Sequence, residues 1–164
     1  MIETYQSEYG QLKSVVLKHP QEAFKNTGFI QRQWKELNYL KPPDFALAKD
    51  EYEAFIELLT RFNIDIHFLP QHPDASLDSI YVRDASIATD LGIVLCHMGK
   101  SERRPEADLQ GEFFLSKGMK IKGKIHPPGT LEGGDTAWTD KNTLAVGRGY
   151  RTNDDGIVQL KQIL

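Results

Sequence analysis

The sequence predicts an α/β fold built from repeated ββαβ modules. Short β-branched, apolar runs bounded by Gly, Pro, Asn or Asp alternate with longer segments that carry a helical period. Their order is strand, helix, strand, then hairpin, helix, strand, then hairpin, helix, which is typical of mixed α/β domains. Of the 164 residues, 40% are hydrophobic and 26% are charged, so the chain can bury a core and disorder is not expected.

The chain is expected to open with a short buried strand at Leu12–Lys18, which is apolar, β-branched and stopped by a proline. Residues 21–44 are polar and irregular, and they predict a long loop with a helical turn around Gln31–Leu40. Long loops in compact domains often form lids or binding loops. A helix is then expected over residues 45–62, with Asp44 as its cap, followed by a strand at Asp65–Leu69.

The rest of the sequence predicts two hairpins, each followed by a helix. These elements are the strands Ser79–Ile87 and Gly92–Met98, a helix over 104–117, a strand at Lys120–His126, the strands Glu132–Trp138 and Thr143–Gly147, and a helix opening at residues 152–155. The modules therefore cover about 1–70, 71–128 and 129–164. We interpret the apolar helix face that runs up to Leu164 as a sign of truncation. A helix that packs on the domain and ends there is the alternative.

Composition excludes several classes of function. The net charge is −3 with no basic stripe, so a nucleic-acid partner is not expected. The N-terminus is polar rather than signal-like, and no apolar run is long enough for a transmembrane helix. Cys96 is the single cysteine and the histidines are scattered, so neither an internal disulfide nor a metal site is expected. We expect a cytoplasmic protein.

Charged residues gather in segments where strands are expected to end. Arg83 and Asp84 interrupt an apolar strand, Glu132 lies beside two glycines, and Arg151 follows a strand just before a helix. The adjacent pair that starts at Arg103 follows another strand. Taken singly, Arg83 and Asp84 are equally well explained by an internal ion pair, and Arg151 by a solvated loop. A capped turn is the simpler explanation for Glu132, and a solvated surface for the pair that starts at Arg103. Together, acids for a planar cation and arginines for a carboxylate describe a site for an arginine-like molecule.

Five segments in order resemble the guanidino-group modifying enzymes, which include arginine deiminases, dimethylarginine dimethylaminohydrolases and amidinotransferases. They are GQLKSVVLKHP, DSIYVRDAS, MGKSERRPE, GTLEGGD and VGRGYRTN. The resemblance is best with the dimethylaminohydrolase-like branch, through the spacing of Asp78 and Asp84 and the final RTN. It implies a pentein-type α/β propeller of five ββαβ modules, of which about two and a half are present. The chain would be the N-terminal part of one catalytic domain, 1–164.

The resemblance also implies roles for individual residues. Asp84 matches the acid that grips the guanidinium, and Glu132 matches the acid that orients the catalytic histidine. Asp78 matches the acid near the substrate α-amino group, and Arg103 and Arg151 match the binders of the α-carboxylate. Residues 21–44 occupy the position of the lid. The catalytic histidine and nucleophilic cysteine belong to later modules, and the adjacent mid-strand residues Cys96 and His97 are not assigned to these roles.

The implied reaction is hydrolysis of a guanidino C–N bond in arginine or a methylated arginine. A cysteine thiouronium intermediate would give citrulline plus ammonia or an alkylamine, with no cofactor. The expected partner is a small guanidino substrate, and no membrane partner is expected. A homodimer is one possible oligomeric state. This chain alone is expected to be inactive. An amidinotransferase and a non-catalytic propeller that binds a partner are the alternatives.

Overall fold

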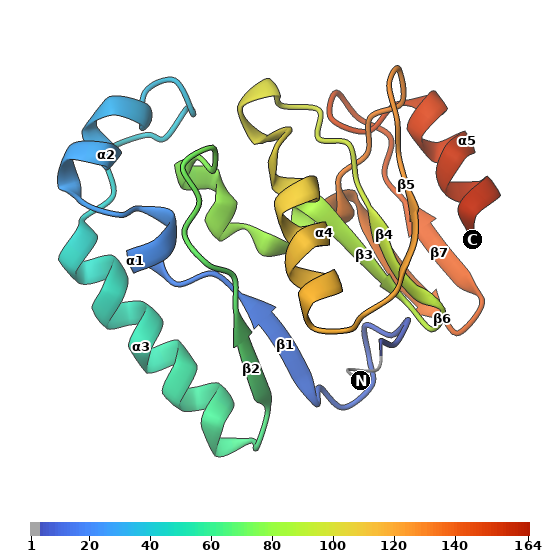
Figure 1. Cartoon of the computed structure of the whole chain (residues 1–164), viewed down its shortest axis with the longest axis horizontal. Helices are drawn as coiled ribbons and strands as arrows, with labels where there is room; N and C mark the ends of the chain where they lie inside the picture. Colours follow the sequence, from blue (N-terminus) through green and yellow to red (C-terminus); the bar gives the residue numbers. More distant parts are fainter. Residues whose placement is uncertain (1–3) are drawn as a thin grey trace. The chain divides into compact units, whose positions relative to one another are not determined.

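The computed structural model describes residues 4–164, which form two compact units. One unit is Gln11–Val82, and the other combines the chain up to Gly10 with Arg83–Leu164. We describe each unit by itself, with the elements labelled as in Figure 1.

In the unit Gln11–Val82, strands β1 (Ser14–Leu17) and β2 (Asp65–Phe68) pair in parallel, with Val15 opposite Ile66. Helix α3 (Phe45–Arg61) connects them and runs alongside the pair (Figure 1). A parallel pair needs such a crossover. The Asp44 side chain caps α3 by accepting hydrogen bonds from the amides of Ala46 and Leu47. The predicted strand, helix and strand are confirmed here.

The long loop predicted at residues 21–44 is wrong in its secondary structure. The segment contains α1 (Pro20–Ala23) and α2 (Thr27–Gln33). The helical turn expected around Gln31–Leu40 is confirmed in part, because α2 ends at Gln33 and the Leu37 amide still donates to the Gln33 carbonyl. The Asn26 side chain caps α2 by accepting from the Phe29 amide at 2.9 Å. The segment also contributes to a hydrophobic core. The buried members of this core are Ala23, Phe24, Ile30, Leu37 and Leu77.

The strand predicted at Ser79–Ile87 is also wrong over most of its length. The chain forms two 3-10 turns, η1 (Leu77–Ile80) and η2 (Val82–Ala85), and only then enters β3 (Ser86–Thr89). Local hydrogen bonds explain the difference. The Ser76 carbonyl accepts from both the amide and the hydroxyl of Ser79, which holds the backbone in a turn.

The second unit contains a three-stranded sheet in the order β3-β4-β5. Strands β3 and β4 (Gly92–Leu95) form the predicted hairpin, and β4 pairs in parallel with β5 (Ile121–Lys124) after helix α4 (Glu106–Ser116). Gly92 at the hairpin turn has φ +127°, and a Cβ there would lie 2.5 Å from the Lys120 carbonyl oxygen. The elements β3, β4, α4 and β5 therefore follow in ββαβ order.

The second hairpin consists of β6 (Thr136–Asp140) and β7 (Thr143–Val146), and helix α5 (Asp154–Ile163) follows it. The strand predicted at Glu132–Trp138 starts later than expected because residues 133–135 form the 3-10 turn η4 (Gly133–Asp135). Asn153 caps α5, as expected, by accepting from the Gly156 amide.

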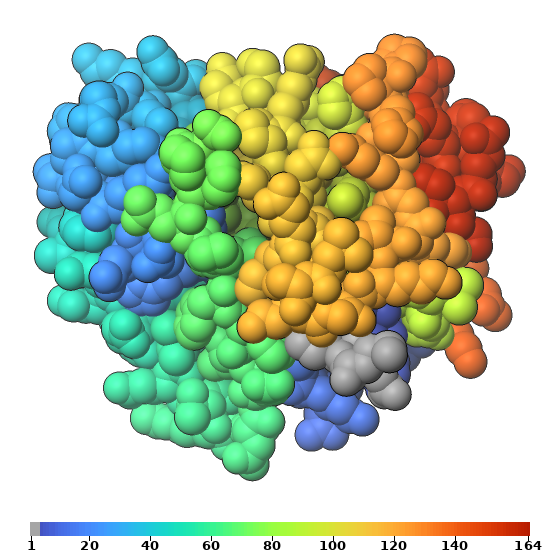
Figure 2. All heavy atoms as spheres, viewed as in Figure 1, coloured from blue at the N-terminus to red at the C-terminus, as the bar shows by residue number. Residues whose placement is uncertain are grey.

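The core of this unit lies between its sheet and helices. All four residues of β4 are buried, and Gly111 of α4 packs closely against Leu95. In Figure 2, the yellow and orange atoms of α4 and its flanking segments hide most of β3 and β4 from view. Among residues 4–164, no helix has both the length and the apolar character that crossing a membrane requires.

Candidate functional site

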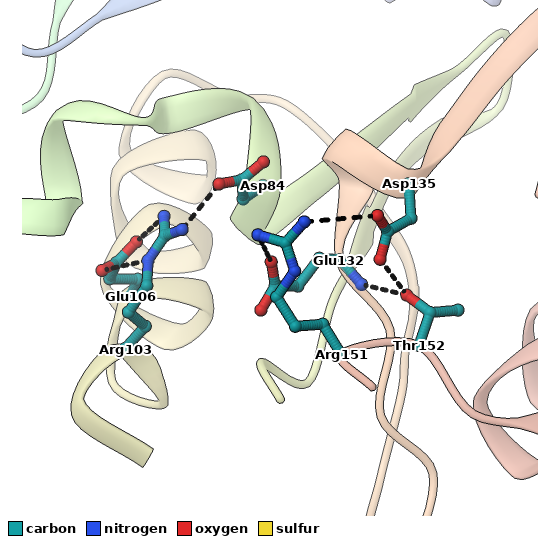
Figure 3. A network of polar contacts seen from close by, with 7 residues as sticks. All are labelled: Asp84, Arg103, Glu106, Glu132, Asp135, Arg151 and Thr152. Atoms are coloured by element: carbon teal, nitrogen blue, oxygen red, sulfur yellow. Dashed lines mark hydrogen bonds and ion pairs between the residues drawn. The ribbon is translucent and has the colours of Figure 1, made fainter. Parts of the chain in front are cut away.

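A group of charged and polar side chains gathers in the unit that contains the three-stranded sheet (Figure 3). We call it the carboxylate–arginine cluster. Its members come from η2, from the 3-10 turn η3 (Ser101–Arg103), from the start of α4, from η4 and its preceding residue, and from the loop before α5. They are Asp84, Arg103, Glu106, Glu132, Asp135, Arg151 and Thr152.

Arg103 is a buried guanidinium held by two carboxylates. Its side chain is 4% exposed. Its Nε donates to Glu106 Oε1 at 2.9 Å and its Nη2 donates to Glu106 Oε2 at 2.7 Å, while its Nη1 donates to Asp84 Oδ2 at 2.6 Å. Burial would lower the pKa of Arg103, but the hydrogen bonds and charges of Glu106 and then Asp84 raise it above its ordinary value. Arg103 is therefore a fixed cation.

Asp84 lies at the place where the backbone of η4 comes close to η2. Its Oδ1 atom lies so near Gly134 that a Cβ on this glycine would collide with it. A Cβ on the neighbouring Gly133 would likewise meet the carbonyl oxygens of Arg83 and Ser86. The two glycines of the EGGD segment thus allow η4 to lie directly against η2, and they leave room for the Asp84 carboxylate.

Glu132 is a buried carboxylate that lacks hydrogen-bond donors. Its side chain is 1% exposed, and among the described residues neither of its carboxylate oxygens accepts a hydrogen bond. Arg151 Nη1 lies 3.4 Å from its Oε2. Burial raises the pKa of Glu132, Arg151 and Arg103 oppose the rise, and Asp84 and Asp135 add to it. Such a carboxylate has unused capacity to accept a donor from outside the group.

Thr152 and Asp135 connect Arg151 to the rest of the carboxylate–arginine cluster. The buried Thr152 hydroxyl donates to Asp135 Oδ2 at 2.7 Å and accepts from the Glu132 amide at 3.2 Å. Arg151 Nη2 lies 3.6 Å from Asp135 Oδ1, and its guanidinium carbon lies 5.4 Å from the ring centre of Tyr150. The Arg151 side chain is 40% exposed, so it can still meet a solvent-borne anion.

The charges of the cluster favour a cation. It combines four carboxylates with two guanidinium groups, so two negative charges are in excess when every acid is ionised. Burial strengthens the attraction between such charges and a bound cation. Since Asp84 already accepts a hydrogen bond from the guanidinium of Arg103, its carboxylate is placed to accept from an N–H donor of this type.

Four of the five residues singled out in the sequence meet in this cluster, namely Asp84, Arg103, Glu132 and Arg151. Glu106, Asp135 and Thr152 also belong to the cluster, although the sequence had suggested no role for them. Asp135 closes the EGGD segment three residues after Glu132, and Thr152 directly follows Arg151, so both lie in segments that had drawn attention. Glu106 lies three residues after Arg103, but nothing in the sequence sets it apart from the other acids of that segment.

Asp78 belongs to the other unit, where it is buried on η1. It lies near the hydroxyl of Tyr39, which comes from the segment that precedes α3. Burial raises the pKa of Tyr39 above its ordinary value, and the charge of Asp78 adds to the rise. Asp78 and residues 20–44 are therefore parts of one packed region of this unit.

Cys96 and His97 had been expected in the middle of a strand. They lie instead just past the end of β4. Cys96 is fully buried, and burial raises the pKa of its thiol. His97 Nδ1 is 2.6 Å from the Gly129 carbonyl oxygen. A buried neutral thiol is a weak nucleophile. Within residues 4–164, no group of three or more His, Cys, Asp or Glu side chains is arranged to hold a metal ion.

Comparison with known proteins gives the family. The sequence model of the arginine deiminase family matches residues 73–164. The dimethylarginine dimethylaminohydrolase of Pseudomonas aeruginosa is 31% identical over 132 residues, which cover 77% of this chain and 49% of that protein. The arginine deiminase of Limosilactobacillus reuteri is 27% identical over 126 residues, covering 73% and 30%. The chain spans about half the length of the first curated relative.

Solved structures show the same fold. A variant of the Pseudomonas aeruginosa dimethylarginine dimethylaminohydrolase in complex with citrulline superposes with a TM-score of 0.76 and 25% identity, covering 94% of this chain and 57% of that one. An amidinotransferase of saxitoxin biosynthesis from Microseira wollei gives a TM-score of 0.69 at 15% identity, which shows the fold alone. The family match covers more than half of the chain, and the chain therefore belongs to the guanidino-modifying arginine deiminase family, which has the pentein fold.

Proposed function

We propose that the whole protein hydrolyses a guanidino C–N bond of arginine or a methylated arginine, and that this chain supplies much of the substrate-binding part. The observation that carries the proposal is the carboxylate–arginine cluster, with its excess of negative charge around Asp84, in a chain of this family. A guanidinium is always charged and presents N–H donors in a fork, so a site for it needs acids.

The proposed roles follow the chemistry of each side chain. Asp84 accepts hydrogen bonds from the guanidinium and places its central carbon. The half-exposed Arg151 receives the substrate α-carboxylate, with Arg103 as its second binder. Asp78 is proposed to meet the α-amino group, and residues 21–44 to serve as the lid. No metal or organic cofactor is part of the proposal.

Glu132 is proposed to orient a catalytic histidine. Support comes from its two buried carboxylate oxygens, neither of which accepts a hydrogen bond from the described residues. An imidazole N–H would satisfy one of them, and the carboxylate would stabilise the imidazolium form. We propose that this histidine and the nucleophilic cysteine lie in the part of the protein that this chain does not span. They would complete a propeller of five modules, with modules here at about 1–70, 71–128 and 129–164.

In the proposed mechanism, the cysteine thiolate adds to the guanidinium carbon and the amine leaves with a proton from the histidine. Water activated by the same histidine then attacks the thiouronium carbon. This step releases the ureido product and restores the thiolate. The acids of this chain contribute by positioning and electrostatic stabilisation. Without the nucleophile, this chain alone is expected to be inactive.

The test uses the whole reading frame that contains this chain. We expect it to release a ureido product from L-arginine or a methylarginine, and Asp84→Ala to lower kcat/KM by about 100-fold or more. Asp50→Ala, which removes an exposed acid from α3, serves as the control and should leave kcat/KM unchanged. Unaltered turnover by Asp84→Ala would refute its role, and absence of turnover by the wild type would refute the hydrolase.

An added acceptor amine separates the hydrolase from the amidinotransferase alternative. A hydrolase gives a ureido product whether or not the amine is present. A transferase gives a new guanidino compound only with the amine. A non-catalytic propeller gives neither product.

A further inference from the structure

Glu106 is the last residue of the segment MGKSERRPE, and none of the roles proposed above involves it. It is 3% exposed at the first turn of α4, and it accepts two hydrogen bonds from the Arg103 guanidinium. Both charges are buried, so neither is stable without its partner. The pairing is bidentate, which fixes the plane of the guanidinium as well as its distance.

The orientation of Arg103 determines where Asp84 is held. Two edges of a guanidinium cannot move independently because the group is planar and rigid. With Nε and Nη2 bound to Glu106, the Nη1 atom points at Asp84 Oδ2, 2.6 Å away. Figure 3 shows the three side chains in this order, with Arg103 between the two acids.

A second contact ties the same segment to α4. The Ser86 hydroxyl donates to Gln110 Oε1 at 2.7 Å, one helical turn beyond Glu106. Gln110 is itself buried, and the neighbouring Gly111 packs against Leu95 of β4. Two contacts thus link the segment that carries Asp84 to α4. One is the Ser86–Gln110 hydrogen bond, and the other runs from Glu106 through Arg103 to the Asp84 carboxylate.

Glu106 also balances a charge. Arg103 alone would place a buried positive group beside the carboxylate that is to receive a cationic substrate. The Glu106 carboxylate neutralises it, so Arg103 can donate to Asp84 without repelling an incoming guanidinium. The contact geometry and the charge arrangement therefore point to the same role.

We propose that Glu106 is a positioning residue that holds Arg103, and through it the Asp84 carboxylate, in the geometry that receives a guanidinium group. Its effect on turnover rests on the function proposed above. Its effect on Arg103 does not.

The experiment compares Glu106→Gln and Glu106→Asp with Glu112→Gln, which removes the same charge from an exposed position on the same helix. The first measurement needs no substrate: NMR of the Arg103 Nε–H proton in this chain. We expect slow exchange with water in the wild type and in Glu112→Gln. Exchange should be at least ten times faster in Glu106→Gln, because the amide cannot accept at both of its ends.

The second measurement is turnover of L-arginine or a methylarginine by the whole protein carrying the same substitutions. Glu106→Gln should lower kcat on the order of 100-fold and change KM much less, because the misplaced group is the one that positions the reacting carbon. Glu106→Asp should recover part of kcat. Thermal unfolding identifies the temperature range in which every variant is folded.

The outcomes separate the two proposals. Slow exchange of the Arg103 proton in Glu106→Gln would overturn the positioning role, whatever the activity. Fast exchange with unchanged kcat would overturn it as well. Fast exchange together with an inactive wild type would refute the proposed hydrolase and leave Glu106 as the residue that holds Arg103.

Discussion

At the scale of single residues, the candidate site depends on how closely the backbone and side chains can approach its carboxylates. Gly134 shows this most directly, because its missing side chain leaves the space that Asp84 Oδ1 occupies. Glu132 shows the opposite case, because its carboxylate is enclosed by protein and none of residues 4–164 donates a hydrogen bond to it. Both residues lie in one segment, EGGD, so a few neighbouring residues determine how the acids of the cluster are placed.

Gly134→Ala is expected to displace Asp84. The added methyl group would overlap its carboxylate, and the carboxylate or η4 would have to move. A displacement of about 1 Å can lower kcat/KM by about 100-fold in the whole protein. Gly149→Ala is the matched control, because no heavy atom lies within 4 Å of its added Cβ and its φ is not positive. Equal kcat/KM values for the two variants would contradict this account of Gly134.

Glu132→Gln is expected to stabilise the fold at neutral pH. The pKa of Glu132 is raised by burial, so the folded state favours the protonated form. The stabilising contribution of that form is complete below the ordinary pKa of 4.5 and is lost as pH rises through the folded pKa. Glutamine mimics the protonated acid at every pH, and each pKa unit of difference corresponds to about 1.4 kcal/mol.

Urea unfolding of the wild type and Glu132→Gln at pH 4 and pH 8 measures this effect. The free energies of unfolding should be similar at pH 4, and the variant should be the more stable at pH 8. Glu112→Gln controls for the loss of a charge at an exposed site. A variant that is less stable than the wild type at pH 8 would show that the ion pair with Arg151 outweighs the cost of burial.

At the scale of elements, the segment before α3 is an integral part of the fold. Ile30 of α2 is fully buried in the core that also contains Leu77, directly before Asp78. Ile30→Ala should therefore lower the free energy of unfolding by about 2–5 kcal/mol. Leu58→Ala, at a position on α3 that is 49% exposed, should cost much less. Similar values for the two variants in urea unfolding would indicate that residues 20–44 are loosely attached.

Elements whose apolar residues recur with a regular spacing could be predicted from the sequence. Helix α3, the strands before and after it in the chain, and the start of β4 lie where their apolar patterns and caps place them. The misplaced elements are those that depend on side-chain-to-backbone bonds. Asn26 starts a helix inside a polar segment, and the hydroxyl of Ser79 holds a 3-10 turn where apolar residues had predicted a strand.

The candidate site was predictable only in part, for a related reason. Asp84, Glu132 and the two arginines are charges in apolar or glycine-rich surroundings, and this contrast is visible in the sequence. Glu106 lies in a helix start rich in acids, where one more glutamate carries no signal. Its importance arises from burial next to Arg103, which only the three-dimensional arrangement reveals.

At the scale of the whole molecule, α3 leaves an apolar face uncovered. None of its residues is fully buried, and Phe55, Leu58 and the adjoining Phe62 recur at helical spacing on one side with exposed fractions of 42%, 49% and 65%. Exposed apolar patches promote association. We expect this chain to self-associate as its concentration rises, and the double variant Phe55→Lys, Leu58→Lys to associate less.

Sedimentation velocity over a hundredfold range of concentration would measure the association, with Lys49→Glu as a control at another α3 position. A wild type that sediments as one monomeric species throughout the range would contradict the expectation. A double variant that associates as strongly as the wild type would locate the contact elsewhere on the chain.

The hydrogen bond between Arg103 and Asp84 has a practical consequence for the choice of denaturant. Guanidinium chloride supplies the same planar cation that Asp84 already binds within the chain. At concentrations too low to unfold the protein, this salt should compete with Arg103 for the Asp84 carboxylate. The spectroscopic signal of the folded state should then change with the salt concentration, whereas urea, which is uncharged, should not cause this change. Stability measurements on this chain are therefore better made in urea, and the difference between the two baselines should report the displacement of Arg103 from Asp84.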